Sequence, residues 1–256
     1  MINNVKSGLA PRHSPGASVN RITNGWRMEI PASSANHEYC LAQVDDYVPL
    51  SRGRFLHSPP WTLSLHARVS QADLPGTWGF GFWNDPFGLS LGFGGKTRRL
   101  PALPNAAWFF YASPPNWLSV HDSIPAQGFF SGTIKSPRIP SIFLAPATLA
   151  LPLMTIRPVS RLLRRLAGRI IRQDACLVST GVTNWHKYSL QWLHEGCEYL
   201  IDDISILQTR FSPPPPLGLV IWIDNQYAAW DPQGRLGSGT LEHPAAWLEI
   251  SEIKME

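Results

Sequence analysis

Short runs of alternating apolar and polar residues recur along most of the chain. In residues 61–69, "WTLSLHARV", the odd-numbered positions are apolar and the even-numbered positions are polar. Because successive side chains of a β-strand point to opposite faces, this alternation predicts a strand with one buried face. Related runs are "TWGFGFW", "AAWFFYAS", "WHKYSLQWL", "CEYLIDD", "GLVIWID" and "AAWLEISEIKM". Strands this frequent, separated by turn residues, predict an all-β protein built as a two-sheet sandwich.

One interval, residues 118–178, departs from this pattern. It contains a proline-rich apolar stretch followed by "VSRLLRRLAGRIIRQD", in which leucine, isoleucine and alanine occupy one half of a helical wheel and five arginines the other. This predicts an amphipathic helix over 158–172 within an insertion, 118–178, of one domain, 21–256, that follows a flexible arm, 1–20. We expect the apolar half of the helix to close over the sandwich as a lid. Peripheral contact of this helix with an anionic membrane is the alternative.

The positive charge of the chain is concentrated in that helix. The 256 residues carry a formal net charge of +4, yet residues 157–172 hold six arginines and no acid, so the remaining 16 basic residues face 18 acidic ones. A general nucleic-acid-binding surface is therefore not expected. The three cysteines form no CxxC motif, and neither a signal-peptide-like run nor a membrane-spanning run occurs. A cytoplasmic protein is the expectation.

Two stretches carry a resemblance to a known family. "NWHKYSLQWLHEGCEYLIDD", residues 184–203, resembles a segment of the concanavalin A-like glucanases, the laminarinase and lichenase group, and "PGTWGFGFWNDP" is similar to the strand before their catalytic strand. The resemblance implies a concanavalin A-like jelly-roll β-sandwich whose concave sheet holds a ligand. It also makes His186 and Tyr188 candidate ligand-binding residues.

The sequence departs from this family where the family's catalytic acids stand. The corresponding strand, "NAAWFFYAS", contains no carboxylate, whereas glycoside cleavage with retention requires two. We therefore do not expect hydrolysis by that mechanism. Instead the strand has two alternate aromatic sets, Trp108 with Phe110 and Phe109 with Tyr111. Either one set faces a ligand or both are buried, with the outer set covered by the insertion.

Acidic and aromatic residues near turns supply the remaining candidates. Asp46 lies in "VDDYV", and Asp224 shares a strand face with Trp222 in "LVIWIDN"; each is a candidate general acid, or else a structural turn carboxylate. Trp83 in "FWNDPFG" and Asn225 are candidate lining residues. No histidine spacing predicts a transition-metal site and no cofactor is expected, although a structural calcium ion bound by acidic loop residues stays open.

Three functions remain open from the sequence. The first is an enzyme that binds a largely apolar small molecule in an aromatic pocket and cyclises or isomerises it. Asp46 or Asp224 would transfer a proton, and Trp108, Trp222 and Tyr111 would stabilise positive charge. The second is a carbohydrate-binding or glycoside hydrolase-like relative of the glucanases. The third is a membrane-peripheral binding module.

Overall fold

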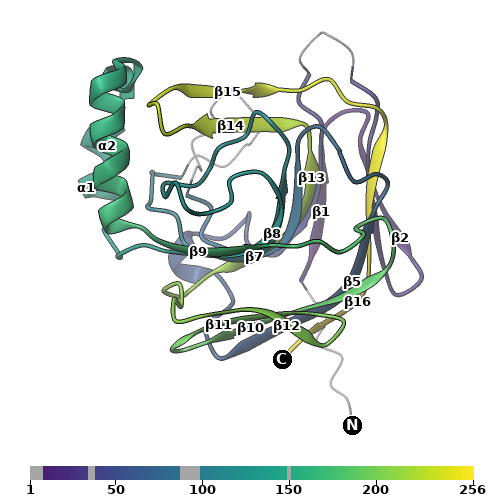
Figure 1. The fold of residues 1–256 in the computed structure, drawn as a ribbon. Helices are drawn as coiled ribbons and strands as arrows, with labels where there is room; N and C mark the ends of the chain where they lie inside the picture. The colour runs from purple at the N-terminus through teal and green to yellow at the C-terminus, as the bar shows by residue number, and fades with distance from the viewer. Residues whose placement is uncertain (1–7, 34–37, 87–98, 149–150) are drawn as a thin grey trace.

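The computed structural model describes residues 8–33, 38–86, 99–148 and 151–256, and it forms two large antiparallel sheets stacked as a sandwich (Figure 1). Sheet A contains seven strands in the order β1 (Ala10–His13), β4 (Leu41–Asp45), β13 (Gly218–Asp224), β6 (Thr77–Trp83), β7 (Ala106–Ala112), β8 (Gly128–Lys135) and β9 (Arg172–Leu177). Sheet B contains β12 (Ile204–Thr209), β11 (Gly196–Ile201), β10 (His186–Leu193), β5 (Trp61–Val69), β16 (Ala246–Met255), β3 (Gly25–Ile30) and β2 (Ser18–Ile22). The predicted two-sheet sandwich is confirmed.

Aromatic side chains from both sheets fill the space between them. Phe109 of β7 packs edge-on against Tyr188 of β10, with ring centroids 5.1 Å apart, and Phe80 of β6 lies 5.2 Å from the same ring. The hydroxyl group of Tyr199 donates to the carbonyl oxygen of Gly132 over 2.6 Å, so the polar end of this buried ring has a partner. The inter-sheet core therefore combines large apolar area with satisfied polar groups.

Strand β7 separates its two aromatic sets onto opposite faces of sheet A. Phe109 and Tyr111 belong to the inter-sheet core, whereas Phe110 belongs to a second apolar cluster on the outward face, against which Trp108 packs. Sheet A curves, and its outward face is the hollow side seen in Figure 1. Both sides of this strand are consequently apolar, which explains why its sequence lacks the clean alternation of β5.

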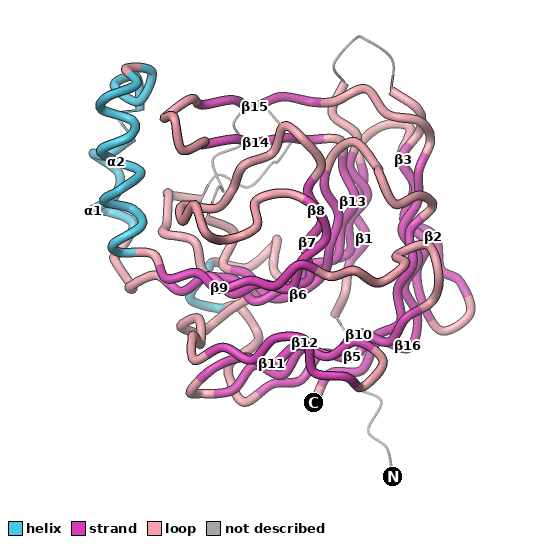
Figure 2. The backbone as a smooth tube through the Cα atoms, in the orientation of Figure 1, coloured by secondary structure: helices cyan, strands magenta, loops and turns pink. Residues whose placement is uncertain are grey.

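Smaller elements lie around the hollow side of sheet A. They are η1 (Arg52–Arg54), a hairpin of β14 (Gln226–Trp230) and β15 (Leu236–Thr240), and the helical segments α1 (Ser141–Thr148), η2 (Leu151–Thr155) and α2 (Arg157–Ile170). Figure 2 shows the helices at one edge of the molecule, beside the ends of the hairpin. No helix among the described residues combines the length and apolarity that crossing a bilayer requires.

The structure changes the predicted domain boundaries in two places. Within the expected flexible arm, 1–20, residues 10–13 form β1 at the edge of sheet A, and β2 begins at Ser18 in sheet B. The expected insertion, 118–178, includes β8 and β9, which are regular strands of sheet A. Because apolar and proline-rich residues surround these two strands, the alternation of apolar and polar residues does not reveal them. The helical excursion is therefore limited to the segment between β8 and β9.

The predicted amphipathic helix is present, but it does not close over the sandwich with its apolar half. Ser160 and Arg164 are its buried residues, while Leu162, Leu166 and Ile170 are exposed. The physical reason is that the two buried polar side chains find hydrogen-bond partners in the rest of the protein, as described below. The lid expectation is therefore corrected.

Replacement of Phe109 by alanine tests the inter-sheet core. Its ring is 1% exposed, so Phe109→Ala should lower the free energy of unfolding by about 3–5 kcal/mol in denaturant titrations. The matched control is Phe143→Ala at an exposed ring of α1, which should change stability by less than about 0.5 kcal/mol. Equal effects of the two substitutions would contradict the assigned core.

Candidate functional site

The outward side of sheet A carries a cluster of aromatic rings, which we call the aromatic face. Trp108 lies 5.0 Å from Phe110 and 5.9 Å from Trp222, measured between ring centroids. Trp83 lies 6.1 Å from Trp108, and Phe130 lies 5.4 Å from Phe110. Four adjacent strands thus supply one continuous apolar surface, because in-register neighbours of antiparallel strands place their side chains side by side.

Glycines beneath these rings create the room that the rings occupy. A Cβ atom at Gly79 would lie 2.9 Å from Cη2 of Trp222, and one at Gly81 would lie 2.6 Å from Cβ of Trp108. Both distances are shorter than van der Waals contact. The indole ring of Trp222 therefore rests on the bare backbone of β6 at Gly79, and the backbone of β7 at Ala107 and Trp108 closely approaches Gly81.

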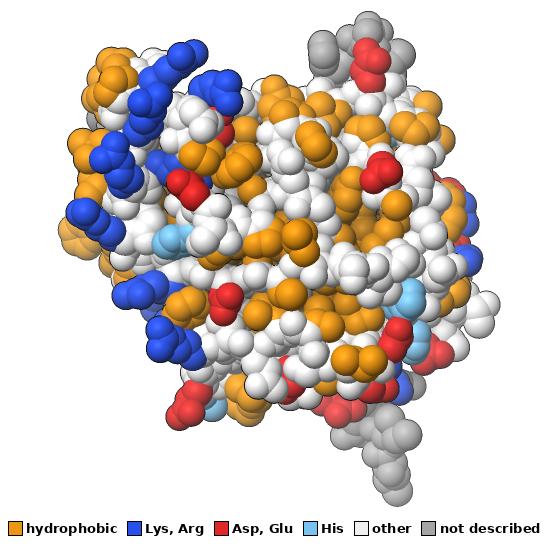
Figure 3. Space-filling view, viewed as in Figure 1, with side chains coloured by type: hydrophobic (Ala, Val, Ile, Leu, Met, Phe, Trp, Pro, Cys, Tyr) orange, Lys and Arg blue, Asp and Glu red, His pale blue; other side chains and the backbone are white. Residues whose placement is uncertain are grey.

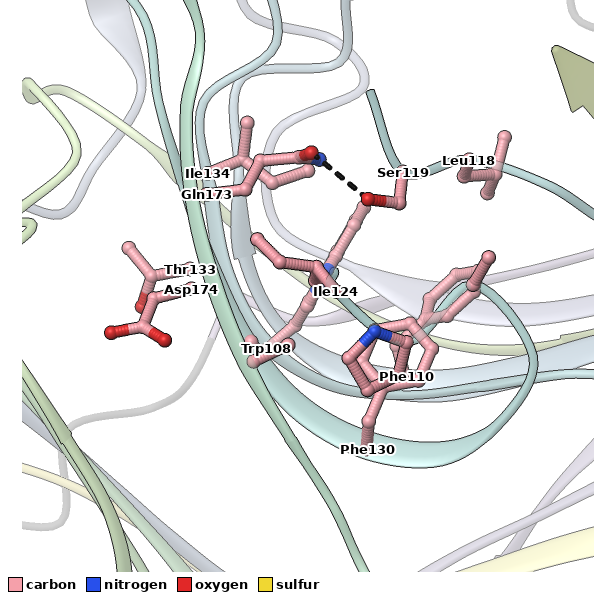
Figure 4. Close-up of a pocket in the computed structure, with 14 residues that line it drawn as sticks. Trp108, Phe110, Leu118, Ser119, Ile124, Phe130, Thr133, Ile134, Gln173 and Asp174 are labelled. Carbon is pink, nitrogen blue, oxygen red and sulfur yellow. Dashed lines mark hydrogen bonds between the residues drawn. The ribbon is translucent and has the colours of Figure 1, made fainter. Parts of the chain in front are cut away.

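The loop between β7 and β8, residues 113–127, roofs part of the aromatic face. Leu118, Ile124 and Pro125 of this loop line a cavity of about 30 Å³ together with Phe110 and Phe130 (Figure 4). A cavity of this size holds water but not a sugar ring. These residues lie within the expected insertion, 118–178, so the insertion covers part of the outward rings, but through this loop and not through the helix.

A buried arginine of α2 holds the roof in place. Arg164 is 5% exposed. Its guanidinium donates hydrogen bonds to the carbonyl oxygens of Ser119 at 2.8 Å and Val120 at 3.0 Å. It also pairs with Asp122 at 2.7 Å and reaches the carbonyl oxygen of Trp230 on β14 at 3.0 Å. Four hydrogen bonds from one guanidinium therefore join the helix, the roof and the hairpin.

A second set of contacts fixes the roof to sheet A. The side-chain oxygen of Gln173, on β9, accepts hydrogen bonds from the backbone N–H of Val120 at 2.9 Å and from the hydroxyl group of Ser119 at 3.2 Å (Figure 4). His121 lies 2.9 Å from the carbonyl oxygen of Ile171 through Nε2. The loop is thus tied at its polar atoms while its apolar side chains cover the rings.

Asp224 lies at one end of the aromatic face, on the same side of β13 as Trp222. Its Oδ1 accepts a hydrogen bond from the hydroxyl group of Thr77 at 2.7 Å, and that hydroxyl accepts from Nε1 of Trp222 at 2.9 Å. Burial raises the pKa of Asp224 to about 7, although the bond from Thr77 and the backbone N–H of Gln226 partly offset the shift. The predicted neighbourhood of Trp222 and Asp224 is therefore present.

A polar edge adjoins the aromatic face on the β1 and β4 side. Asp45 accepts hydrogen bonds from Nε of Arg12 at 2.8 Å and from the side-chain amide of Gln43 at 2.9 Å. Gln43 is the register partner of Trp222. This edge is not among the predicted site residues. The alternation in "LAQVD" could have found it, since buried Ala42 and Val44 place Gln43 and Asp45 on the opposite face.

Asp46 and Asn225 are structural in this arrangement. Asp46 accepts hydrogen bonds from Nε2 of His57 at 2.5 Å and from the backbone N–H of Leu219 at 2.9 Å. The His57 ring packs against the core ring of Phe82, so Asp46 belongs to the core side. Asn225 accepts from the backbone N–H of Cys40 and donates to two backbone carbonyl oxygens. Neither residue lies on the aromatic face.

Tyr111, Tyr188 and His186 also lie apart from the aromatic face. Tyr111 stacks on Trp78 inside the core, with centroids 5.6 Å apart. Tyr188 is in the core between the sheets. His186, the first residue of β10 in sheet B, bonds to Asp202 over 2.6 Å. Of the predicted site residues, the structure brings together Trp83, Trp108, Phe110, Trp222 and Asp224.

The described part of the chain contains no group of three or more His, Cys, Asp or Glu side chains that could hold a metal ion. The outward positions of β7 are Ala106, Trp108, Phe110 and Ala112, none of which ionises. What the site offers is therefore apolar ring surface, a polar edge that includes the buried Asp45, and the buried carboxyl group of Asp224.

Comparison with known proteins identifies the fold. No protein-family model matches the chain, and no curated protein matches it. A glycoside hydrolase family 16 endo-glucanase from Bacteroides ovatus shares 10% identity and a TM-score of 0.52, covering 98% of this chain and 95% of the glucanase. A legume lectin-like domain from Entamoeba histolytica shares 10% identity and a TM-score of 0.50, covering 99% of this chain and 91% of that domain. The chain has the concanavalin A-like jelly-roll fold.

Arg164→Met tests the attachment of the roof. The substitution leaves the carbonyl oxygens of Ser119, Val120 and Trp230 without this donor, so it should lower the free energy of unfolding by about 2–4 kcal/mol. Amide hydrogen exchange should accelerate within residues 118–126 in particular. The control, Arg165→Met on the exposed side of the same helix, should leave exchange there unchanged. Unaltered exchange in Arg164→Met would refute the clamp.

Asp224 makes the stability of the protein depend on pH. Its carboxyl group keeps a proton up to about pH 7 when folded, but loses it near its ordinary pKa of 3.8 when unfolded. Since the folded state then binds more protons, the free energy of unfolding should fall between pH 4 and 7, by roughly 4 kcal/mol at most. Asp224→Asn should remove this component of a denaturation series. Parallel pH profiles of variant and parent would disprove it.

Proposed function

We propose that this protein binds a carbohydrate chain on its aromatic face and does not cleave it. The observation that carries the proposal is the cluster of Trp83, Trp108 and Trp222 on the outward side of sheet A. One face of a pyranose ring presents C–H groups, and such a face packs against a flat indole ring. Trp83 and Trp108 are only half-buried, so their rings are accessible beside the roof.

The polar edge suits the hydroxyl groups of a sugar. Arg12 and Gln43 are both half-buried, and each keeps further N–H donors beyond the single bond it gives to Asp45. Binding sites of this kind combine an apolar floor with a few convergent polar groups. The roof restricts the accessible part to the side of Trp83 and Trp108, which favours a short stretch of glycan.

Two of the proteins with a similar fold support a carbohydrate ligand, since one is an endo-glucanase and the other a legume lectin-like domain. The residues present argue against cleavage. Retaining glycosidases use two carboxyl groups roughly 5 Å apart, and the outward positions of β7 carry none. Asp45 is already paired with Arg12. A binding role therefore fits the side chains better than hydrolysis.

A second candidate function, proton-assisted cyclisation or isomerisation of an apolar small molecule, rests on Asp224. A carboxyl group with a pKa of about 7 suits general acid catalysis near neutral pH. Its oxygen is however occupied by Thr77 and by the backbone N–H of Gln226, and it does not line the cavity under the roof. Turnover of a polyene or similar substrate that disappears in Asp224→Asn would favour this candidate over carbohydrate binding.

The carbohydrate proposal is tested by replacing the accessible tryptophans. A glycan array first identifies a ligand, and calorimetry then measures its affinity for Trp83→Ala and Trp108→Ala. Loss of one stacking ring should weaken binding about tenfold, which corresponds to about 1.4 kcal/mol. Trp185→Ala, at an exposed ring next to Arg68 on the other sheet, is the matched control and should bind normally.

Two results would overturn the proposal. One is the absence of any glycan ligand for the parent protein in the array, and the other is undiminished affinity in both tryptophan variants. A reducing-sugar assay on the ligand should detect no product. Release of product by the parent protein would show cleavage and refute the non-hydrolytic part.

A further inference from the structure

Exposed large hydrophobic side chains are concentrated in the short segment between β8 and β9. Fifteen large hydrophobic side chains are exposed among the described residues, and eight of them lie within residues 139–170. Phe143 is 72% exposed, Ile142 69% and Leu162 54%. Clusters of this kind on a soluble surface mark interaction sites. We call this set the helical apolar patch: Ile139, Ile142, Phe143, Leu153, Ile156, Leu162, Leu166 and Ile170.

Helix α2 turns Leu162, Leu166 and Ile170 away from the fold, while its other leucine, its valine and its alanine are half-buried. The inward side of the helix is polar. Ser160 accepts a hydrogen bond from Nε1 of Trp230 at 2.9 Å, and Arg164 donates hydrogen bonds to the roof. Gly168 also faces inward, since a Cβ atom there would lie 3.3 Å from the carbonyl oxygen of Val120. An ordinary surface helix buries its apolar stripe. The stripe of α2 is therefore left for a partner outside the chain.

A row of arginines runs beside the apolar stripe. Arg157, Arg161, Arg165 and Arg169 follow one another at four-residue spacing and are exposed, so they form one line along the helix. Within the described residues no acidic side chain forms an ion pair with any of them. Figure 3 shows this blue row along one edge of the molecule, bordered by orange apolar side chains on its outer side.

The charge of this segment differs from that of the rest of the chain. Residues 138–172 contain seven arginines and no Asp or Glu, whereas the remainder has 15 basic against 18 acidic residues. A negatively charged, apolar partner is complementary to such a surface. A second copy of this chain is not, because joining two such faces would bring two rows of arginines together without an acid in either segment.

We propose that the helical apolar patch and its arginine row dock the protein onto the surface of an anionic membrane. Phe143, Leu162 and their neighbours enter the boundary between headgroups and acyl chains, and the arginines bind lipid phosphates and carboxylates at the same depth. The two helices lie at the outer edge of the molecule (Figure 1), so a flat bilayer reaches them without touching sheet B. This role is separate from ligand binding on the aromatic face.

Vesicle flotation with the full chain tests the proposal. The parent protein should float with phosphatidylcholine vesicles that contain phosphatidylserine, and at least about tenfold less with phosphatidylcholine alone. Ile142→Ser/Phe143→Ser and Arg157→Gln/Arg165→Gln should each reduce flotation about tenfold or more. The matched controls are Ile204→Ser and Arg54→Gln, at exposed positions elsewhere, which should float like the parent.

Several outcomes would overturn it. Failure of the parent protein to float with anionic vesicles is one, and flotation that is insensitive to the two apolar substitutions is another, since it would indicate charge attraction alone. A third outcome comes from light scattering on the same samples, which measures the oligomeric state. A parent dimer that becomes monomeric in Ile142→Ser/Phe143→Ser would assign the patch to a second copy. Circular dichroism of each variant, matching the parent, establishes that the substitutions act at the surface.

Discussion

The burial of aromatic rings on both sides of β7 is the interaction on which the rest of the structure depends. On one side Phe109 and Tyr111 fill the space between the sheets, and on the other Trp108 and Phe110 belong to the aromatic face. If β7 had only one apolar side, its outward side chains would be hydrated and would need no covering loop. Because both sides are apolar, the outward rings require a roof, and the roof requires its clamp.

This dependence links the elements in a chain of contacts. The rings are covered by the β7–β8 loop, the loop is held by Arg164, and Arg164 fixes the orientation of α2. Because the polar side of the helix binds the loop and Trp230, Leu162, Leu166 and Ile170 face outward. The exposed surface at the edge of the molecule is thus a consequence of how the hollow of sheet A is closed.

The sequence predicts the sandwich well, because period-two alternation is a local property of each strand. It also predicts that one aromatic set of β7 faces outward, with Trp222 and Asp224 sharing a side of β13.

Tyr111 could not join Trp108, since residues three apart on a strand point to opposite faces. Alternation along a strand predicts that only one carboxylate of Asp45 and Asp46 points toward a ligand. The contact between Asp46 and His57 turns Asp46 toward the core, so the prediction of Asp46 as the site carboxylate is wrong. The prediction of His186 and Tyr188 as site residues depended on a resemblance that indicates a fold but not which side of the sheet holds a ligand.

The helix was predicted by its amphipathicity. Its orientation is set by one buried arginine that no periodicity distinguishes from its exposed neighbours.

The glycines of β6 have a consequence for how this fold can diversify. The indole ring of Trp222 occupies the volume that a methyl group at Gly79 would need, so this ring and this glycine behave as a matched pair across neighbouring strands. A new ligand preference on this surface cannot arise by exchanging a tryptophan alone, because that would open a void over bare backbone. It requires coordinated change at two positions far apart in the chain, which makes the floor of the hollow slow to evolve while its rim stays free to vary.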